Sequence, residues 1–313
     1  MGWFDRFADW AADKVQSFTG EKERRRLVAE LKDHVAEFKE NVENALAILN
    51  RRIQGFNDRI RELNRLRQGD VFRNIAVLSV FLGKFGEVKD AGDYAGEREK
   101  PMQALPERPF ETRETYISDV DWSSDEVFVN TFFRTPLGMK FKTRKQNLSM
   151  RERLHEFKLE AEHTLKELET RAFAVETDQN ICALYIECIK YISRFIEEVI
   201  LPELELVEAF FQALAIKDRV IAGHPLQHAA FRNRNPIWVL RDTPYEKHYL
   251  FVKNAFLFYV LSCKIYNTPV LTRLLDHQTT NEDLTAMERQ KEAIRLQGEH
   301  VRRQLIMSGQ VAL

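Results

Sequence analysis

Apolar residues recur every three or four positions between Glu21 and Gln68, and this repeat constrains the fold more than any other feature of the sequence. The average step is about 3.5 residues, the period at which one side of a helix forms a continuous apolar seam. Charged residues fill the other sides. We therefore expect one long helix that pairs along its seam, within or between chains, with an interruption near Gly69. The predicted self-association seam consists of Leu27, Leu31, Phe38, Leu49, Phe56 and Leu63.

The composition of the whole chain also favours helices. Its 313 residues include only 12 glycines and 9 prolines, which is typical of long helices rather than turn-rich β architecture. The predicted fold class is mainly α, an elongated helical bundle with a long coiled-coil-like helix and a small β-hairpin insert. The predicted domains are an amphipathic N-terminal helix (1–20), a long helical arm (21–90), a proline-containing insert (91–146) and a helical bundle (147–313).

The insert and the bundle differ in their patterns. Prolines and glycines interrupt the insert too often for a long helix, so we expect a loop and then a β-hairpin with strands at 126–133 and 139–143. Apolar spacing in the bundle predicts helices at 150–175, 178–221, 245–266, 269–277 and 281–306. Asp178 is the predicted cap of the second of these helices, which should kink near Pro202. The apolar runs 75–82 and 250–263 are too short or too interrupted to span a membrane and should be core.

The first nineteen residues predict an amphipathic helix with an unusually aromatic side. Its apolar stripe contains Trp3, Phe4, Phe7, Trp10, Val15 and Phe18. Burying each such side chain gains on the order of 1–3 kcal/mol, and tryptophan favours the headgroup region of a bilayer. The polar side is slightly acidic, so insertion would depend on apolar contact rather than on attraction to anionic lipid. Two interpretations remain open, contact with a membrane and docking on protein.

The opening residues Met1–Trp10, with the sequence MGWFDRFADW, resemble the start of phage shock protein A and its relatives, the bacterial ESCRT-III-like membrane-remodelling proteins. The resemblance covers the N-terminal helix only. It implies a short amphipathic helix followed by long helices that form a hairpin, and it implies that residues 21–68 take the place of the first long helix. It also implies assembly on a membrane surface.

Signals for chemistry are weak in this sequence. A formal net charge of −1 does not favour bulk binding of polyanions, so nucleic acid is not an expected partner. Phosphate-binding, dinucleotide-binding, serine-hydrolase and zinc-protease motifs are all absent, and we expect no catalytic residues and no enzyme activity. The three cysteines have no metal-binding spacing, and we expect reduced core thiols, no metal and no cofactor. One basic cluster could contact phosphate groups, namely Lys140, Lys142, Arg144 and Lys145.

The sequence therefore predicts a non-enzymatic, peripheral membrane-binding helical protein that self-assembles as a scaffold or in membrane remodelling. We expect a homo-oligomer in the cytoplasm, peripheral to the inner face of the plasma membrane, because the chain shows no secretory signal pattern. Two alternatives stay open. One is a membrane-disrupting, pore-forming effector. The other is a cytosolic structural or adaptor subunit that docks its aromatic N-terminal helix on a protein partner.

Overall fold

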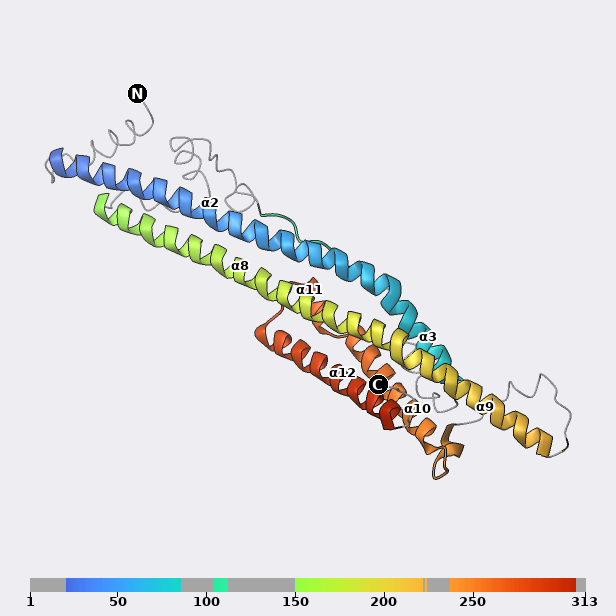
Figure 1. The fold of residues 1–313 in the computed structure, drawn as a ribbon. Helices are drawn as coiled ribbons and strands as arrows, with labels where there is room; N and C mark the ends of the chain where they lie inside the picture. Colours follow the sequence, from blue (N-terminus) through green and yellow to red (C-terminus); the bar gives the residue numbers. More distant parts are fainter. Residues whose placement is uncertain (1–20, 86–103, 112–149, 222, 224–236, 308–313) are drawn as a thin grey trace. The chain divides into compact units, whose positions relative to one another are not determined.

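The structure is a computed structural model that describes residues 21–85, 104–111, 150–221, 223 and 237–307 (Figure 1). Those residues form helices and contain no strand, which confirms the mainly α prediction. The predicted β-hairpin at 126–143 lies outside the described residues. The helices are α2 (Glu21–Leu66), α3 (Phe72–Gly83), α8 (Met150–Phe195), α9 (Leu201–Ile221), α10 (Glu246–Tyr266), α11 (Val270–Leu275) and α12 (Asn281–Met307).

The chain divides into two compact units, each assembled from separate parts of the sequence. Unit 1 comprises residues 1–57 and 108–176, and unit 2 comprises residues 58–107 and 177–313. The two long helices α2 and α8 contribute residues to both units.

In unit 1, α2 and α8 run side by side in the same direction (Figure 1). Glu30 pairs with Lys158 at 3.3 Å, and further along both helices Arg52 pairs with Glu176 at 2.9 Å. From α8 the core receives Leu168, Ala172 and Val175. The buried positions of α2 in this unit follow steps of three and four, and each is at most 4% exposed: Val35, Phe38, Val42, Leu46, Leu49, Ile53 and Phe56. The predicted seam is therefore a real packing surface.

Unit 2 is built around α10, which packs mainly on α12 and also on α3 and the short 3-10 helix η6 (Ile237–Leu240). Its largest fully buried side chains include Tyr185 and Tyr259. The Tyr185 hydroxyl donates to the backbone oxygen of Tyr266 at 3.0 Å, and the Tyr266 hydroxyl donates to the backbone oxygen of Arg67 at 3.0 Å. These bonds satisfy polar groups that would otherwise be costly inside an apolar core.

The apolar runs 75–82 and 250–263 do supply core residues to unit 2. Ile75, Leu78 and Leu82 are each at most 2% exposed, and Phe258 is fully buried. Val80, in contrast, is 66% exposed on α3. Each run thus covers the core with one side and leaves the other side toward solvent.

Both predicted irregularities of the long helices coincide with π-helical turns. Gly69 has φ −101° and ψ −118° within η1 (Arg67–Val71), so the interruption expected there is confirmed. A second turn, η4 (Ile196–Ile200), comes directly before α9, where a kink was expected near Pro202. Proline has no backbone N–H to donate to the carbonyl four residues earlier, which favours a local rearrangement at this point.

The predicted helix boundary at Asp178 is wrong. The helix α8 continues through this position from Met150 to Phe195. Asp178 is only 2% exposed, and one of its carboxylate oxygens accepts a hydrogen bond from the Thr279 hydroxyl. The connection before α12 thus supplies a partner for this buried carboxylate within a continuous helix.

Two asparagines of α2 hold the backbone of the extended segment 104–111. In unit 1, the Asn57 side-chain amide donates to the backbone oxygen of Arg108 at 2.9 Å and accepts from the Arg108 N–H at 2.8 Å. In unit 2, Asn64 makes the same pair of bonds with Leu105, both at 2.9 Å. Each asparagine therefore satisfies both backbone polar groups of one residue in a segment that has no strand to pair with.

α12 and α8 come close together at Gly298 in unit 2. A β-carbon at this position would overlap the Tyr191 hydroxyl oxygen and would lie 3.3 Å from a ring carbon of Phe195. The Tyr191 ring stacks on Phe195 with their centroids 5.5 Å apart, so a shift of the phenol would disturb this stacking. Glycine is therefore used inside a helix, despite its poor helix propensity, to allow this packing.

Replacing Asn64 by alanine should release the backbone of Leu105. Both bonds to that residue are lost, so its amide proton should exchange with solvent at least about tenfold faster, corresponding to about 1.4 kcal/mol of lost protection. Hydrogen exchange followed by mass spectrometry measures this rate. Asn44→Ala, on an exposed position of the same helix, is the control and should leave the exchange at Leu105 unchanged.

Gly298→Ala should destabilise the protein by about 1–3 kcal/mol, because the overlap with Tyr191 outweighs the gain of about 1 kcal/mol in helix propensity. Thermal unfolding measures the loss. Gly83→Ala is the matched control, since nothing lies within 4 Å of the added methyl group. Adding Tyr191→Phe to the Gly298→Ala variant removes the overlapping oxygen and should restore part of the stability. Equal melting temperatures for all four proteins would contradict the proposed packing.

Candidate functional site

The described part of unit 1 contains an open groove of about 710 Å³ between α2 and α8. Six of its eleven lining residues are aliphatic or aromatic, and the other five are asparagines or charged residues. Arg52 and Glu176, both of which line the groove, form the ion pair described above. The lining residues are Asn41, Asn44, Ala45, Ile48 and Arg52 from α2, and Leu165, Leu168, Glu169, Ala172, Phe173 and Glu176 from α8.

The groove arises because each helix carries apolar residues on one flank of the seam as well as in it. Leu168 and Ala172 are buried at the bottom, whereas Ile48 is 49% exposed and Phe173 is 58% exposed. An amphipathic helix laid into such a groove is a common mode of peptide recognition.

The extended segment 108–111 lies on the other side of the helix pair. Asn57, which holds Arg108, comes nine residues after Ile48, and nine residues correspond to about two and a half helical turns. The two side chains therefore leave α2 in opposite directions. On α8, Arg171 pairs with Glu111 at 3.3 Å, and it projects about 200° around the helix from Phe173. The described part of this segment thus leaves the groove open.

The residues selected from the sequence fall into two groups. Phe38, Leu49, Phe56 and Leu63 are each at most 3% exposed within the single chain, and Leu27 and Leu31 belong to α2. The other group lies outside the described residues, and it comprises the aromatic stripe (Trp3, Phe4, Phe7, Trp10, Val15 and Phe18) and the basic cluster (Lys140, Lys142, Arg144 and Lys145).

Sequence reasoning missed the groove. Ile48 lies outside the seam, and Phe173 stands in a charged stretch of α8, so neither attracted attention. A signal was nevertheless present, because Asn41, Ala45, Ile48 and Arg52 follow the same steps of three and four on the flank of the seam. Only the pairing with α8 turns this flank into a groove.

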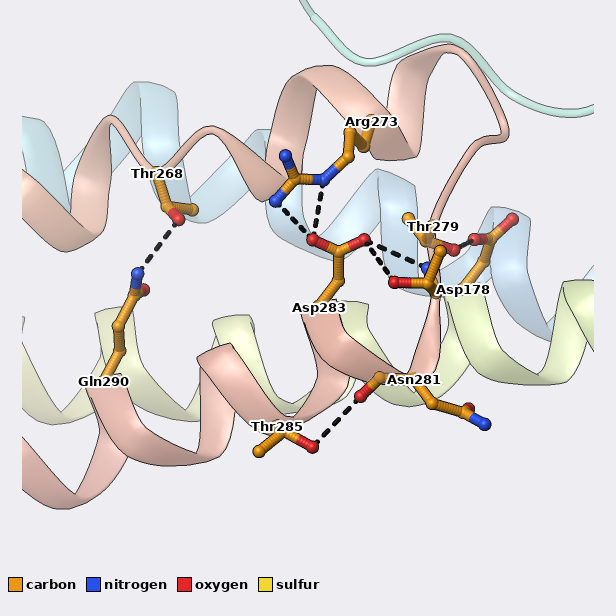
Figure 2. Close-up of polar contacts among 9 residues, drawn as sticks. Asp178, Thr268, Arg273, Thr279, Asn281, Asp283, Thr285 and Gln290 are labelled. Atoms are coloured by element: carbon orange, nitrogen blue, oxygen red, sulfur yellow. Dashed lines mark hydrogen bonds and ion pairs between the residues drawn. The ribbon is translucent and has the colours of Figure 1, made fainter.

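A connected polar cluster in unit 2 lies at the start of α12 (Figure 2). One carboxylate oxygen of Asp283 accepts from Arg273 Nε at 2.6 Å and pairs with Arg273 Nη2, and the other accepts from the backbone N–H of Thr280 at 3.0 Å. An acid three residues after the capping threonine is the usual way to satisfy the first amides of a helix. Thr279 reaches Asp178, and Gln290 donates to Thr268 at 3.2 Å. Through these hydrogen bonds and the Arg273–Asp283 ion pair, the cluster links α8, α11 and α12.

Asp283 remains ionised in this cluster although it is buried. Burial alone would raise the pKa of its carboxyl group, but the hydrogen bonds from Arg273 and Thr280 and the charge of Arg273 outweigh that effect. The pKa of Asp283 therefore lies below its ordinary value. This carboxylate is held as a structural partner and is not suited to exchange protons at neutral pH.

Two other buried groups of unit 2, the Cys188 thiol and the His248 imidazole, are held neutral. Burial raises the pKa of the Cys188 thiol to about 11, which makes it a poor nucleophile at neutral pH. Burial, followed by the charge of Lys247, lowers the pKa of His248, whose ring stacks on Phe210 with centroids 4.4 Å apart. All three cysteines are reduced and buried, as expected.

The buried cation of Arg67 is stabilised by aromatic rings. Its guanidinium carbon lies 5.8 Å from the ring centre of Tyr185 and 5.3 Å from that of Tyr266, and the residue is 8% exposed. Contacts of this kind contribute up to about 2 kcal/mol when the cation is desolvated. They anchor the π-helical turn in which Arg67 lies.

No group of three or more histidine, cysteine or carboxylate residues that could hold a metal ion occurs among the described residues. None of the described helices combines the length and apolar character needed to cross a bilayer.

No family model matches this chain, and comparison with curated proteins and with solved structures finds no similar protein. The resemblance of the opening residues to phage shock protein A therefore stays a hypothesis.

Asp283→Ala should lower the free energy of unfolding by about 1–3 kcal/mol at neutral pH, because the helix start and Arg273 lose a buried partner. Since the pKa of Asp283 is lowered in the folded state, its stabilisation is present at neutral pH and is lost as the pH falls through that lowered value.

Urea unfolding of both proteins at several pH values tests this, and the difference between them should shrink below about pH 4. Glu282→Ala, at an exposed position in the same helical turn, is the control, with an expected loss of about 0.3–1 kcal/mol. A difference between wild type and Asp283→Ala that stays constant down to strong acid would contradict the assignment.

Proposed function

We propose that this chain is a non-enzymatic, peripheral membrane-binding helical protein that self-assembles. The aromatic stripe of residues 3–18 carries the proposal. Two tryptophans and three phenylalanines on one side of a predicted helix are costly to leave in water, and a bilayer surface accepts such a helix through its apolar side. The predicted polar side has three aspartates against one arginine and one lysine, so binding should depend little on anionic lipid or salt.

The described residues support a scaffold rather than a catalyst. The polar clusters of unit 2 have structural explanations: Asp283 satisfies a helix start, Asn64 holds a backbone segment, and Arg67 lies between two tyrosines. Buried groups such as Cys188 and His248 are kept neutral. In unit 1 the groove between α2 and α8 is lined by six apolar residues and by five asparagines or charged residues, a mixture that suits the binding of an amphipathic helix.

The adaptor alternative remains the main competitor, and the groove favours it as much as it favours self-assembly. In that alternative the aromatic stripe binds a different protein and has no affinity for lipid. A direct measurement of lipid binding separates the two.

Co-sedimentation with phosphatidylcholine vesicles, with and without anionic lipid, tests the membrane part of the proposal. The full chain should sediment with both kinds of vesicle. Trp3→Glu should abolish sedimentation and leave the melting temperature unchanged, because a carboxylate at the apolar side opposes insertion. Leu257→Glu, at a 46% exposed position of α10, is the matched control and should sediment as the wild type does.

A wild-type chain that stays in the supernatant with both kinds of vesicle would contradict the membrane proposal. A large fall in melting temperature for Trp3→Glu would instead show that the stripe belongs to the folded core.

A further inference from the structure

An aromatic cluster in unit 2 connects α9 with the start of α10, and one of its rings can take up a proton. The imidazole of His248 stacks on the Phe210 ring with centroids 4.4 Å apart, and the Tyr245 ring lies 4.9 Å from Phe210. Next to Phe210, the Phe211 ring lies 6.0 Å from Phe85, which follows α3. Packing between these helices therefore includes a histidine, the side chain whose charge changes near neutral pH.

The surroundings of His248 favour its neutral form. The residue is only 6% exposed, and it lies in the first turn of α10, where the positive end of the helix dipole opposes a further positive charge. Burial, followed by the charge of Lys247, lowers the pKa of His248. The face of the Phe210 ring attracts a cation, but burial removes water from the whole imidazole, and the lowered pKa reflects that loss.

Other charged groups near the cluster have partners of their own. Lys84, at the end of α3, pairs with Glu208 of α9 at 2.7 Å, and in the connection before α10 Arg241 pairs with Asp242 at 3.8 Å. Glu246 lies in the first turn of α10, where an acidic residue suits the helix start. The four residues of η6, which packs on α10, are Ile, Trp, Val and Leu and cannot titrate.

The helix α12 also packs on α10, and it brings two arginines near its end. Arg303 pairs with Glu299 at 3.8 Å, and the Arg302 guanidinium carbon lies 5.4 Å from the ring centre of Phe195. Among the charges of the described chain, that of Lys247 is the one that shifts the pKa of His248.

We propose that His248 makes the contact between α9 and the start of α10 sensitive to pH. At neutral pH the uncharged imidazole packs on Phe210. As the pH falls below about 6.5, the ordinary histidine value, protonation favours a state in which the imidazole leaves this contact for water. Acid therefore opens the contact and exposes the Phe210 ring, a site separate from the aromatic stripe.

The direction of this dependence follows from the lowered pKa of His248. The closed contact binds fewer protons than the open one, so its stability is fully present above the ordinary histidine value and decreases as the pH falls below that value. The effect begins at a higher pH than the loss of the Asp283 contribution, which is expected below about pH 4. A measurement near pH 5 thus separates the two groups.

Hydrogen exchange of the full chain, followed by mass spectrometry at about pH 7.5 and about pH 5, tests the proposal. After correction for the intrinsic exchange rate, peptides that cover residues 205–214 and 246–253 should exchange at least about threefold faster in acid, because the two helices lose their shared packing. Peptides from residues 45–56 in unit 1 serve as the reference and should keep their rates. Equal corrected rates at the two pH values for residues 205–214 and 246–253 would overturn the proposal.

A matched pair of histidine variants tests whether His248 is responsible. His248→Phe keeps an aromatic ring against Phe210 but cannot be protonated, so the acceleration in acid should disappear. His300→Phe, at an exposed position of α12, is the control and should accelerate as the wild type does. Circular dichroism at neutral pH checks that both variants fold. An acceleration that persists in His248→Phe, or that His300→Phe also removes, would overturn the proposal.

Lys247→Gln provides a test that leaves the cluster itself intact. Lys247 is exposed, and removing its charge brings the pKa of His248 closer to the ordinary value. Acid should then accelerate exchange less than in the wild type, and an equal or larger acceleration would contradict the proposal. None of these measurements uses lipid, so their outcome is independent of the membrane proposal.

Discussion

The apolar seam of α2 is the interaction on which the rest of unit 1 depends. Side chains at steps of three and four, among them Phe38, Leu49 and Phe56, leave water by packing between α2 and α8. At about 25 cal/mol per Å² of apolar surface, burial of this extent dominates the stability of a pair of helices. The surface polar contacts, such as the Arg52–Glu176 pair, contribute little energy and mainly fix how the two helices align.

A parallel alignment of α2 and α8 has consequences for the chain between them. Two helices that run in the same direction require the connection to return along their length, as in other parallel arrangements. The described part of that connection is extended, and it obtains its hydrogen bonds from Asn57 in unit 1 and from Asn64 in unit 2. Among the described residues of unit 1, a groove lies along one flank of the seam.

The sequence predicted the elements that have strong periodicity. The long α2, its interruption at Gly69, and the helices α10, α11 and α12 were all expected within a few residues, because burial on one side of a helix leaves a visible period. The break at Asp178 was wrong because an aspartate inside a helix looks like a cap until its partner, Thr279, is known. That partner is about a hundred residues away, and local pattern cannot reveal it.

In the candidate site, too, local features could be predicted from the sequence and long-range contacts could not. The aromatic stripe is visible in the sequence because its residues are close together, whereas the groove needs Ile48 and Phe173 from two helices that only the fold brings together. The roles of Asn57 and Asn64 also depend on a segment that is distant in the sequence. The local sequence around these asparagines does not predict their hydrogen bonds to Arg108 and Leu105. The period of apolar residues and the composition thus predict individual helices. The surfaces between helices form only when the helices pack together.

The central proposal is that the aromatic stripe of residues 3–18 binds a lipid surface or a second copy of the chain. The most direct measurement follows the fluorescence of Trp10 in a variant whose other tryptophans, Trp3, Trp122 and Trp238, are replaced by phenylalanine. In dilute protein without lipid, acrylamide should quench Trp10 strongly. Quenching should fall as the protein concentration rises or as vesicles are added. A Trp10 that is already protected in the dilute monomer, with no change on either addition, would contradict the account.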